Sequence, residues 1–201
     1  MRRTARPSAF LLTALLGLLG QPAVAADDAP PPPVSLVVRA PSSVGYHLDH
    51  TLHEVIGVSK RVEGTATLPS PGAVEVEVRV RVDGFDSGNS SRDARMLEVT
   101  EAARFPLVVL KVAGTFAPPA AWPATVEATL SGTLAFHGLV RPVSFQARVV
   151  FTAPGAATAT ASFAISLKEF EVEPPSLLFM SIKDRAVITA TLALSADPPA
   201  P

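Results

Sequence analysis

The chain has 201 residues, of which 48% are hydrophobic and 17% charged, with a formal net charge of −1 and no cysteine. The absence of thiols excludes disulfides, thiolate zinc sites and cysteine nucleophiles. Because the sequence has no excess of positive charge and no basic stripe, it predicts no nucleic-acid partner. A single domain of this length buries enough surface to be stable through its apolar core alone.

Residues 1–25 have the three parts of a secretory signal peptide. Arginines near the start form a basic region, and Ala9–Leu19 is an apolar segment too short to span a bilayer. Ala23-Val24-Ala25 supplies a small-x-small cleavage signal. We therefore expect cleavage after Ala25, a periplasmic or secreted location, and a mature chain without a transmembrane segment.

The composition then changes twice along the chain. Residues 26–34 are rich in proline and form an expected linker. The alternation of apolar and polar residues that marks a folded domain runs over residues 35–194. Residues 195–201 have the small and proline-rich composition of a disordered tail.

The folded part begins with strand-like segments. Ser35–Ala40, Val44–His50 and Arg61–Leu68 each read as a short strand, whereas His50–Ser59 has no clear periodicity. The clearest strand is Val74–Val82, where valines alternate with charged residues. A helix would distribute these valines around all its sides, so this pattern predicts a strand with one buried face.

A short helix interrupts the strands between Gly84 and Pro106. Ser90 and Asp93 have the spacing of a capping box, which would begin the helix at Ser90. Met96, Val99 and Ala103 give this helix one apolar side. Because the rest of the chain is strand-like, we expect the apolar side to cover one end of a sheet structure.

The second half of the chain returns to alternation. Leu107–Val112 is apolar on both faces, and Phe116–Pro123 is a proline-rich loop. Three further strands precede a loop at Glu171–Leu177, and a last strand covers Met180–Leu194. The apolar faces of the three strands contain Val126, Ala128, Leu130, Gly132, Leu134 and Phe136, then Val143, Phe145, Ala147, Val149 and Phe151, then Ala159, Ala161, Phe163 and Ile165.

These elements predict an all-β fold of about eight or nine antiparallel strands, either a barrel or a sandwich, with one helix. A barrel of about eight strands is wide enough to be filled by side chains or to hold one small ligand. Several residues expected to point inward are small, and they would either leave a cavity or relieve crowding between strands. These residues are Gly64, Ala66, Ala128, Gly132, Ala147, Ala159 and Ala161.

Four stretches together resemble the YceI-like family of exported lipocalin-like proteins. Ser42–Tyr46 with His50 is similar to the opening strand of the family, and Ser91–Leu97 with Phe105-Pro106 is similar to its helix. Gly132–Gly138 with Pro142-Val143 resembles its histidine–glycine hairpin. Phe163–Phe170 and Ser181–Thr191 resemble its last two strands. The sequence departs from the family at Arg95, where the helix motif often has histidine.

The resemblance implies a single antiparallel lipocalin-like β-barrel with one short capping helix. It also implies a non-enzymatic periplasmic carrier that holds a polyisoprenoid lipid or a quinone tail inside the barrel, with no other cofactor. The alternative is a structural or interaction module of the cell envelope with a filled core and a role in stress. A homodimer is compatible with either function.

The residues that we expect to contact the apolar ligand combine inward-facing positions with one charge at the rim. They are Tyr46, Val78, Val80, Phe85, Arg92, Met96, Val109, Leu134, Phe136, Phe145, Phe163 and Ile165. Arg92 has an alternative role in a surface or intramolecular ion pair, and its neighbour Asp93 is expected to cap the helix.

Other polar groups favour no chemistry of their own. His47, His50 and His53 would share one side of a helix, but on a strand His50 points away from the other two, so we expect no metal site. His137 precedes Gly138 at an expected hairpin turn, where glycine supplies the positive φ and the histidine is incidental. The sequence contains no Gly-x-Ser-x-Gly elbow and no glycine-rich phosphate loop, so we expect no enzyme.

Overall fold

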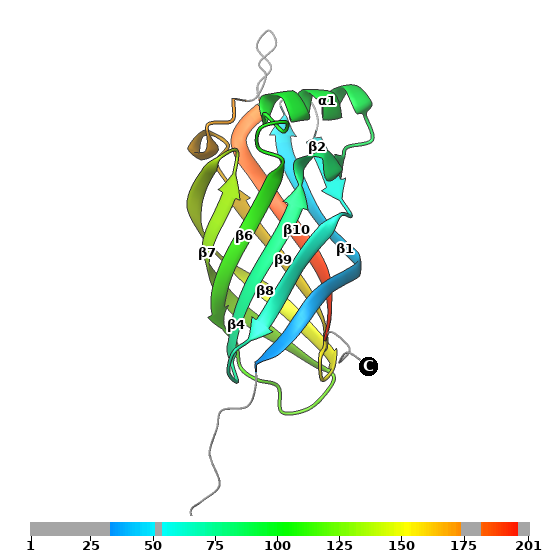
Figure 1. The fold of residues 1–201 in the computed structure, drawn as a ribbon, viewed down its shortest axis with the longest axis vertical. Coiled ribbons are helices and arrows are strands. Elements are labelled where there is room, and N and C mark those ends of the chain that lie inside the picture. The colour runs from blue at the N-terminus through cyan, green and yellow to red at the C-terminus, as the bar shows by residue number, and fades with distance from the viewer. Residues whose placement is uncertain (1–32, 51–53, 174–181, 197–201) are drawn as a thin grey trace, which may run out of the picture. The chain divides into compact units, whose positions relative to one another are not determined.

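The segments in which apolar and polar residues alternate form ten strands, and one α-helix interrupts them (Figure 1). The computed structural model describes residues 33–50, 54–173 and 182–196. All of these residues belong to one compact unit, Pro31–Pro201. The strands are β1 (Val34–His50), β2 (Glu54–Ser59), β3 (Val62–Leu68), β4 (Ala73–Arg81), β5 (Phe85–Asp86), β6 (Leu107–Thr115), β7 (Ala124–Phe136), β8 (Leu139–Ala153), β9 (Ala156–Ile165) and β10 (Ile182–Ala196). The helical segments are α1 (Ser90–Val99) and the 3₁₀ helices η1 (Val82–Gly84) and η2 (Lys168–Phe170).

Eight of the strands close into an antiparallel barrel, which excludes the sandwich. Their order around the barrel is β1, β3, β4, β6, β7, β8, β9 and β10, and the pairing of β10 with β1 closes the ring. The short strands β2 and β5 extend this sheet where β1 runs past β3. The prediction of an all-β antiparallel barrel is confirmed.

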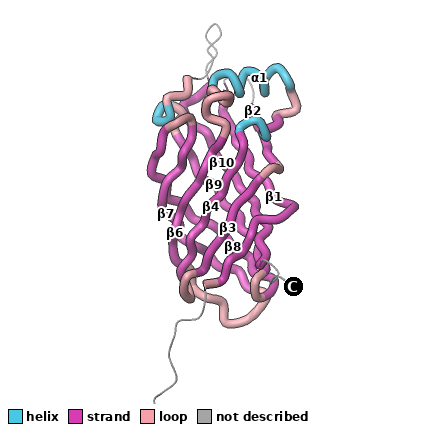
Figure 2. Tube along the Cα trace, viewed as in Figure 1, coloured by secondary structure: helices cyan, strands magenta, loops and turns pink. Residues whose placement is uncertain are grey.

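The two ends of the barrel differ in the segments that cover them. Every helical segment of the described chain lies at one end, which we call the helix end (Figure 2). The opposite end carries the turns 69–72 and 154–155 and the loop 116–123, and we call it the loop end (Figure 1). The expected loop between β6 and β7 is confirmed.

The valines of β4 show how the alternating pattern builds the wall. Val78 and Val80 are buried and face the barrel interior with the other even-numbered valines of the strand. On the outer face, the carboxylate of Glu77 lies 2.5 Å from Arg79 and 3.4 Å from Lys111 of the neighbouring strand. The strand ends at Arg81, and Val82, which we expected to be its last residue, begins η1 instead.

Strand β1 is continuous where the sequence predicts two strands. Pro41 interrupts its ladder with β10, and the register shifts between Arg39 and Ser43. The side chain of Ser42 replaces the missing backbone contacts, because its hydroxyl donates to the Arg39 carbonyl and accepts from the amide of Ala193 at 2.9 Å. The buried Ser42 hydroxyl thus keeps β1 bonded to β10 across the irregularity.

The unassigned segment before β3 also forms structure. Residues 54–59 pair with the second half of β1 as strand β2, while residues 51–53 lie outside the described residues. Ser59 at the end of β2 is completely buried, and its hydroxyl accepts from the amide of Arg61 at 3.2 Å. This contact stabilises the bend between β2 and β3.

Helix α1 begins one residue earlier than the capping box of Ser90 and Asp93 requires. Asn89 is the N-cap, and its side-chain oxygen accepts from the amide of Arg92 at 3.1 Å. Asp93 instead accepts from the amide and the hydroxyl of Ser87, in the turn before the helix. The expectation that Ser90 caps the helix with Asp93 is therefore wrong, because Asn89 already satisfies the free amide.

The wall between β8 and β9 is the least regular part of the barrel. The ladder between these strands runs from Ala153 and Ala156 to the pair Ala147 and Ala161, where it stops. Beyond that point η2 packs against β8, and Arg141 Nε donates to the carbonyl of Glu169 at 2.8 Å. A helical turn rather than a strand pair completes the wall at the helix end.

The last strand is slightly longer than expected. Strand β10 continues to Ala196, and Ser195 pairs with Val37 of β1, although both Ser195 and Ala196 belong to the segment expected to be a tail. Residues 197–201 and most of the expected loop 171–177 lie outside the described residues. No helix in the described part of the chain is long and apolar enough to cross a membrane.

Candidate functional site

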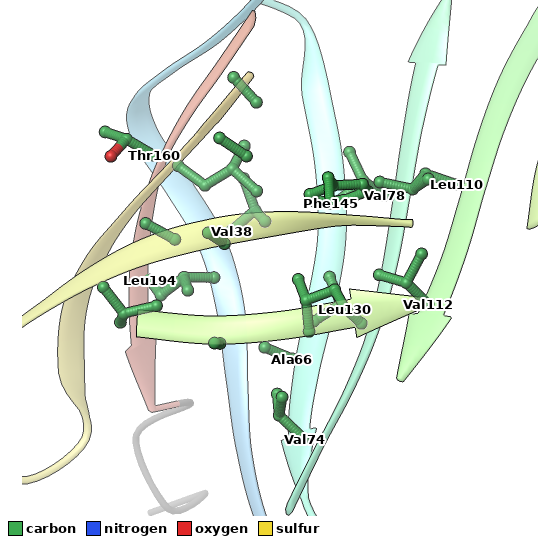
Figure 3. Close-up of a pocket in the computed structure, with 18 of the residues that line it drawn as sticks. Val38, Ala66, Val74, Val78, Leu110, Val112, Leu130, Phe145, Thr160 and Leu194 are labelled. Atoms are coloured by element: carbon green, nitrogen blue, oxygen red, sulfur yellow. The ribbon is translucent and has the colours of Figure 1, made fainter. Parts of the chain in front are cut away.

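The interior of the barrel contains two apolar cavities that follow each other along its axis. The central cavity, of about 130 Å³, lies between the side chains of Val38, Val78, Leu110, Leu130 and Phe145 (Figure 3). The helix-end cavity, of about 260 Å³, extends from the barrel interior to the inner side of α1. The two cavities share four lining residues and therefore adjoin each other. The shared residues are Val44, Val108, Leu134 and Ile188.

The central cavity offers almost no polar groups. Only Thr65 and Thr160 among its lining residues have a polar side chain, and Figure 3 shows one oxygen, that of Thr160, among the carbon atoms drawn. That hydroxyl lies 3.4 Å from the carbonyl of Arg148. An apolar cavity of this kind excludes water and favours an apolar guest.

The small inward residues serve two different purposes. A Cβ atom on Gly64 would lie 2.4 Å from the carbonyl oxygen of Glu77, and one on Gly132 would lie 2.1 Å from that of Lys111. These glycines therefore permit close approach between strands. The alanines in the same pattern line the central cavity and leave it open; they are Ala66, Ala128, Ala147, Ala159 and Ala161.

Aromatic side chains bound the central cavity. The rings of Phe145 and Phe163 stack in parallel with their centroids 4.4 Å apart, at the point where the β8–β9 ladder stops. At the loop end, Phe151 contacts Phe116 with centroids 5.9 Å apart and Trp122 with centroids 5.4 Å apart. Three aromatic rings thus pack together at the loop end of the barrel.

The helix-end cavity combines apolar walls with a few polar groups. Met96 and Val99 of α1 form its cover, and Phe136 and Ile165 lie on its wall. Tyr46, Arg92, Arg95 and Thr100 are the lining residues with polar side chains. The hydroxyl of Thr100 is already used, because it donates to the Met96 carbonyl at 2.7 Å.

Tyr46 lies against a glycine on the neighbouring strand. Gly57 is its cross-strand partner, and a Cβ atom at Gly57 would lie 2.4 Å from the Tyr46 ring. The ring also contacts Phe85, with centroids 5.4 Å apart. Burial raises the pKa of the Tyr46 hydroxyl, and the negative charge of Asp93 raises it further, whereas the positive charge of Arg92 lowers it.

The guanidinium of Arg92 is held by the turn before α1. Its Nε donates to the Ser87 hydroxyl at 3.0 Å, and its Nη2 donates to the Ser87 carbonyl at 3.3 Å. Ser87 in turn donates to Asp93. Arg92 therefore lines the cavity with a fixed orientation rather than forming the surface ion pair that we considered.

Most residues predicted to contact a ligand do line the cavities. Val78, Val80, Phe145 and Phe163 lie at the central cavity and Leu134 at both. Six more residues line the helix-end cavity, namely Tyr46, Phe85, Arg92, Met96, Phe136 and Ile165.

Val109 is the exception. The neighbouring residues Val108 and Leu110 line the interior, so strand alternation directs Val109 to the outer face, where it pairs with Arg79 and Ala135. Its expected inward position is wrong. Because Leu107–Val112 is apolar on both faces, its pattern did not define which residues point inward.

His137 is not incidental to the hairpin turn. Both His137 (φ 50) and Gly138 (φ 74) adopt positive φ, and the histidine side chain is only 10% exposed. Its Nδ1 lies 2.7 Å from the carbonyl oxygen of Phe170, and its Nε2 lies 3.6 Å from the carboxylate of Glu101. The side chain thus joins the β7–β8 turn to η2.

Three residues in and around η2 that close the wall were not predicted from the sequence. Leu167, Phe170 and Val172 are buried, and Phe170 is 1% exposed. Leu167 and Val172 line the helix-end cavity. Three residues with one-sided burial are too few for a periodic signal, although Phe170 lies within a stretch quoted for the family resemblance.

A metal site at the histidines is not tested by the structure. His47 Nε2 lies 3.6 Å from the carboxylate of Glu54, whereas the side chain of His50 and all of His53 lie outside the described residues. Within residues 33–50, 54–173 and 182–196, no group of three metal-ligating side chains gathers.

An eight-stranded antiparallel barrel with an apolar interior and one covering helix defines a lipocalin-like barrel. The family model of the YceI-like domain matches residues 37–194, and the chain belongs to the YceI-like family. The resemblance stated from the sequence is therefore confirmed. None of the curated proteins compared with the chain matches it.

Solved structures agree with this fold. The chain is similar to a polyisoprenoid binding domain from Saccharophagus degradans implicated in plant cell wall breakdown, with a TM-score of 0.66 and 15% identity over 82% of this chain and 99% of that one. It is also similar to BcnA from Burkholderia cenocepacia, with a TM-score of 0.63 and 17% identity over 78% of this chain and 98% of that one.

Proposed function

We propose that the protein is a periplasmic or secreted binding protein that carries one long apolar molecule, a polyisoprenoid lipid or a quinone tail, inside its barrel. The observation that carries this proposal is the pair of adjoining apolar cavities along the barrel axis. Each Å² of apolar ligand surface removed from water contributes about 25 cal/mol to binding. A long chain gains more than a compact ligand, because it can occupy both cavities.

Two further observations support the class of ligand and the location. The solved structure from Saccharophagus degradans is named for polyisoprenoid binding, and this chain shares its fold and belongs to the YceI-like family. The signal-peptide pattern of residues 1–25 supports export. We propose no catalytic role and no cofactor other than the bound lipid.

The test is native mass spectrometry of protein purified from its own cell envelope, followed by organic extraction. We expect about one isoprenoid per chain, in keeping with one set of adjoining cavities. Empty protein that also fails to take up added quinones or prenyl phosphates would instead favour the interaction module with a filled core.

A pair of matched variants locates the ligand. Ala161→Phe fills the central cavity from β9, and Ala113→Phe adds the same ring on the exposed outer face of β6. We expect Ala161→Phe to abolish lipid retention while Ala113→Phe retains it, with both proteins folded by circular dichroism. Equal retention by both variants would contradict binding inside the barrel.

A further inference from the structure

The loop end of the barrel differs from the helix end in its charge. Five segments of the described chain meet there, and none of them contains an acidic, basic or histidine residue; they are residues 33–38, 66–74, 112–126, 149–158 and 190–196 (Figure 1). The helix that covers the opposite end carries charges of both signs along its length, at Arg92, Asp93, Arg95 and Glu98. Since 17% of the chain is charged, an end built from five uncharged segments is a distinct feature of the surface.

The loop 116–123 presents an exposed aromatic side chain at this end. Trp122 is 43% exposed, and residues 117–121 before it are alanines and prolines. Its ring packs edge-on against Phe151 with centroids 5.4 Å apart, so the barrel wall fixes its position. Val34, which pairs with Leu68 at the start of β1, is 47% exposed. A tryptophan has an apolar body and a polar N–H group, and it is typical of a membrane–water interface.

The central cavity reaches the same end of the barrel. Leu68, Phe116, Phe151 and Leu194 line this cavity, and Phe151 also contacts Trp122. Packed aromatic rings therefore separate the apolar interior from the uncharged outer surface. An apolar molecule that exchanged between a bilayer and the cavity at this end would stay away from water, and exclusion from water is what drives its binding.

The lack of charge indicates which lipids fit this surface. Proteins bind anionic lipids through clusters of lysine and arginine, and the described segments of the loop end contain neither residue. In the sequence, these segments continue into residues 26–32 and 197–201, whose charged residues are Asp27, Asp28 and Asp197. A zwitterionic lipid surface, bound through apolar contact rather than charge, is therefore the complementary partner.

A protein partner fits this end less well than a bilayer. A stable protein interface buries about 800 Å² on each partner and has several buried anchors at its centre. Among the described residues, the loop end offers two large exposed apolar side chains, Trp122 and Val34, surrounded by small residues and prolines. One exposed ring on an uncharged surface is instead suited to weak, reversible contact with lipid.

We propose that the loop end docks on the surface of a zwitterionic lipid bilayer, with the Trp122 ring at the level of the lipid head groups. This inference rests on the proposed function, because a carrier of an apolar ligand has to exchange that ligand with a membrane. It adds the partner and the face of the barrel that meets it. The helix end then faces the aqueous phase.

Trp122 is itself the probe for the first test, because it is the only tryptophan of the chain. Protein purified from its own cell envelope is titrated with phosphatidylcholine vesicles while its fluorescence is recorded. We expect the emission to shift to shorter wavelength and to be quenched by lipids that are brominated near the head-group end of their acyl chains. Vesicles that contain phosphatidylglycerol are expected to bind no more tightly, and added salt is expected to change the affinity little, because no cation takes part.

Matched variants place the same charge at the two ends of the barrel. Ala121→Glu adds a carboxylate beside Trp122, and Ala103→Glu adds one at an exposed position after α1. We expect Ala121→Glu to lower the affinity for phosphatidylcholine vesicles about tenfold, measured by flotation, and Ala103→Glu to leave it unchanged. Circular dichroism checks that both variants fold.

A second pair of variants removes apolar surface instead of adding charge. Trp122→Ser is expected to lower the affinity for the same vesicles about fivefold, because its ring no longer leaves water on docking. Val140→Ser is the control, since Val140 is 57% exposed on β8 and lies outside the five segments of the loop end. Its affinity is expected to equal that of the natural protein.

The outcomes separate docking from ligand carriage. Vesicle binding that Ala121→Glu weakens and Ala103→Glu does not weaken supports docking through the loop end. Equal binding by both glutamate variants, or no vesicle binding by protein that retains an isoprenoid, would overturn docking and leave the carrier function intact. Vesicle binding by protein that neither holds nor takes up an isoprenoid would overturn the carrier function instead. A dimer that Ala121→Glu converts to a monomer, without vesicle binding, would assign this surface to a second copy of the chain and overturn docking.

Discussion

The loop-end half and the helix-end half of the barrel are built from the same strands but closed in different ways. In the loop-end half, all eight neighbouring strands of the barrel are paired, and β8 pairs with β9 from Ala153 to Ala147. In the helix-end half the β8–β9 ladder has stopped, and η2 and α1 complete the structure through side chains. The loop-end half encloses the central cavity, which has no charged lining residue. The helix-end half contains Arg92 and Arg95, which line the second cavity.

The two halves are thus stabilised differently, by strand pairing in the loop-end half and by additional side-chain contacts in the helix-end half. A repeating pattern of small and branched apolar residues is enough to make a wall and a dry interior. The helix-end half has no ladder between β8 and β9 beyond Ala147 and Ala161, and polar contacts of His137, Arg141 and Asp184 attach η2 there instead.

The largest expected effect comes from removing an aromatic ring from the wall of the central cavity. Phe145→Ala deletes a buried side chain that stacks on Phe163, and large-to-small changes of this kind cost about 3–5 kcal/mol. We expect the free energy of unfolding, measured by urea denaturation, to fall by this amount in one cooperative transition. A loss below about 1 kcal/mol would mean that the interior around Phe145 is not packed as described.

Phe170→Ala is the matched deletion in the helix-end half, since Phe170 is 1% exposed. We expect hydrogen exchange to accelerate first at residues 139–146 and 162–165, which face each other where the β8–β9 ladder is absent. Uniform acceleration throughout the barrel would show that the two halves open together and would remove the distinction between them.

The third prediction concerns the contact of Tyr46 with Gly57. Gly57→Ala places a methyl group 2.4 Å from the tyrosine ring, which must move, and overpacking of this kind costs about 1–3 kcal/mol. The displaced ring also loses its contact with Phe85. In a Tyr46→Leu background the cost of Gly57→Ala is expected to shrink, and a cost that stays unchanged would place its origin elsewhere.

A smaller effect is expected at the start of α1. Asn89→Ala removes the acceptor of the Arg92 amide and is expected to lower the stability by about 1 kcal/mol, as caps usually do. Ser90→Ala is the control and is expected to change the stability little, because the Ser90 side chain has no role as the cap. Both losses are measured by urea denaturation. A larger loss in Ser90→Ala than in Asn89→Ala would instead support the capping box predicted from the sequence.

The sequence predicted the strands of the barrel wall well. Strict alternation over Val74–Val82 defines a strand and its inward face without any further information, and the barrel follows from repeating such strands. The prediction was wrong at Val109, because a segment that is apolar on both faces has no distinguishable inward side.

The irregular contacts of the barrel were harder to predict, because they join distant residues. No local sequence pattern shows that His137 contacts the carbonyl of Phe170, which is far along the chain. The same holds for the hydrogen bond from the Ala193 amide to Ser42, beside Pro41. Asn89 and Ser90 are both good caps, and only the geometry of the turn selects between them. The position of α1 over one end of the barrel was expected because the helix is single and amphipathic, which is a tertiary argument rather than a pattern.

The smallest expected effect is a pH dependence confined to the helix-end half. Asp184 accepts from the amide of Lys168 and from the Ser166 hydroxyl, both at 2.8 Å, and so ties η2 to β10. The hydrogen bond from the Lys168 amide, and then that from Ser166, lower the pKa of Asp184 below its ordinary value of 3.8. This contact therefore contributes its full stabilisation above pH 3.8 and loses it as the pH falls through the lowered pKa.

Protection factors from hydrogen exchange at residues 166–172 provide the measurement. In the natural protein they are expected to fall in acid below about pH 4, whereas in Asp184→Asn they are already low at neutral pH and change little. Glu77 and Asp83 on and beside β4 also have lowered pKa values, through Arg79 and Arg81, so global stability falls in acid as well. Comparison with Asp184→Asn separates the contribution of Asp184 from that of Glu77 and Asp83. If the protection factors at residues 166–172 fall in acid in the variant as well, the loss is due to those other carboxylates.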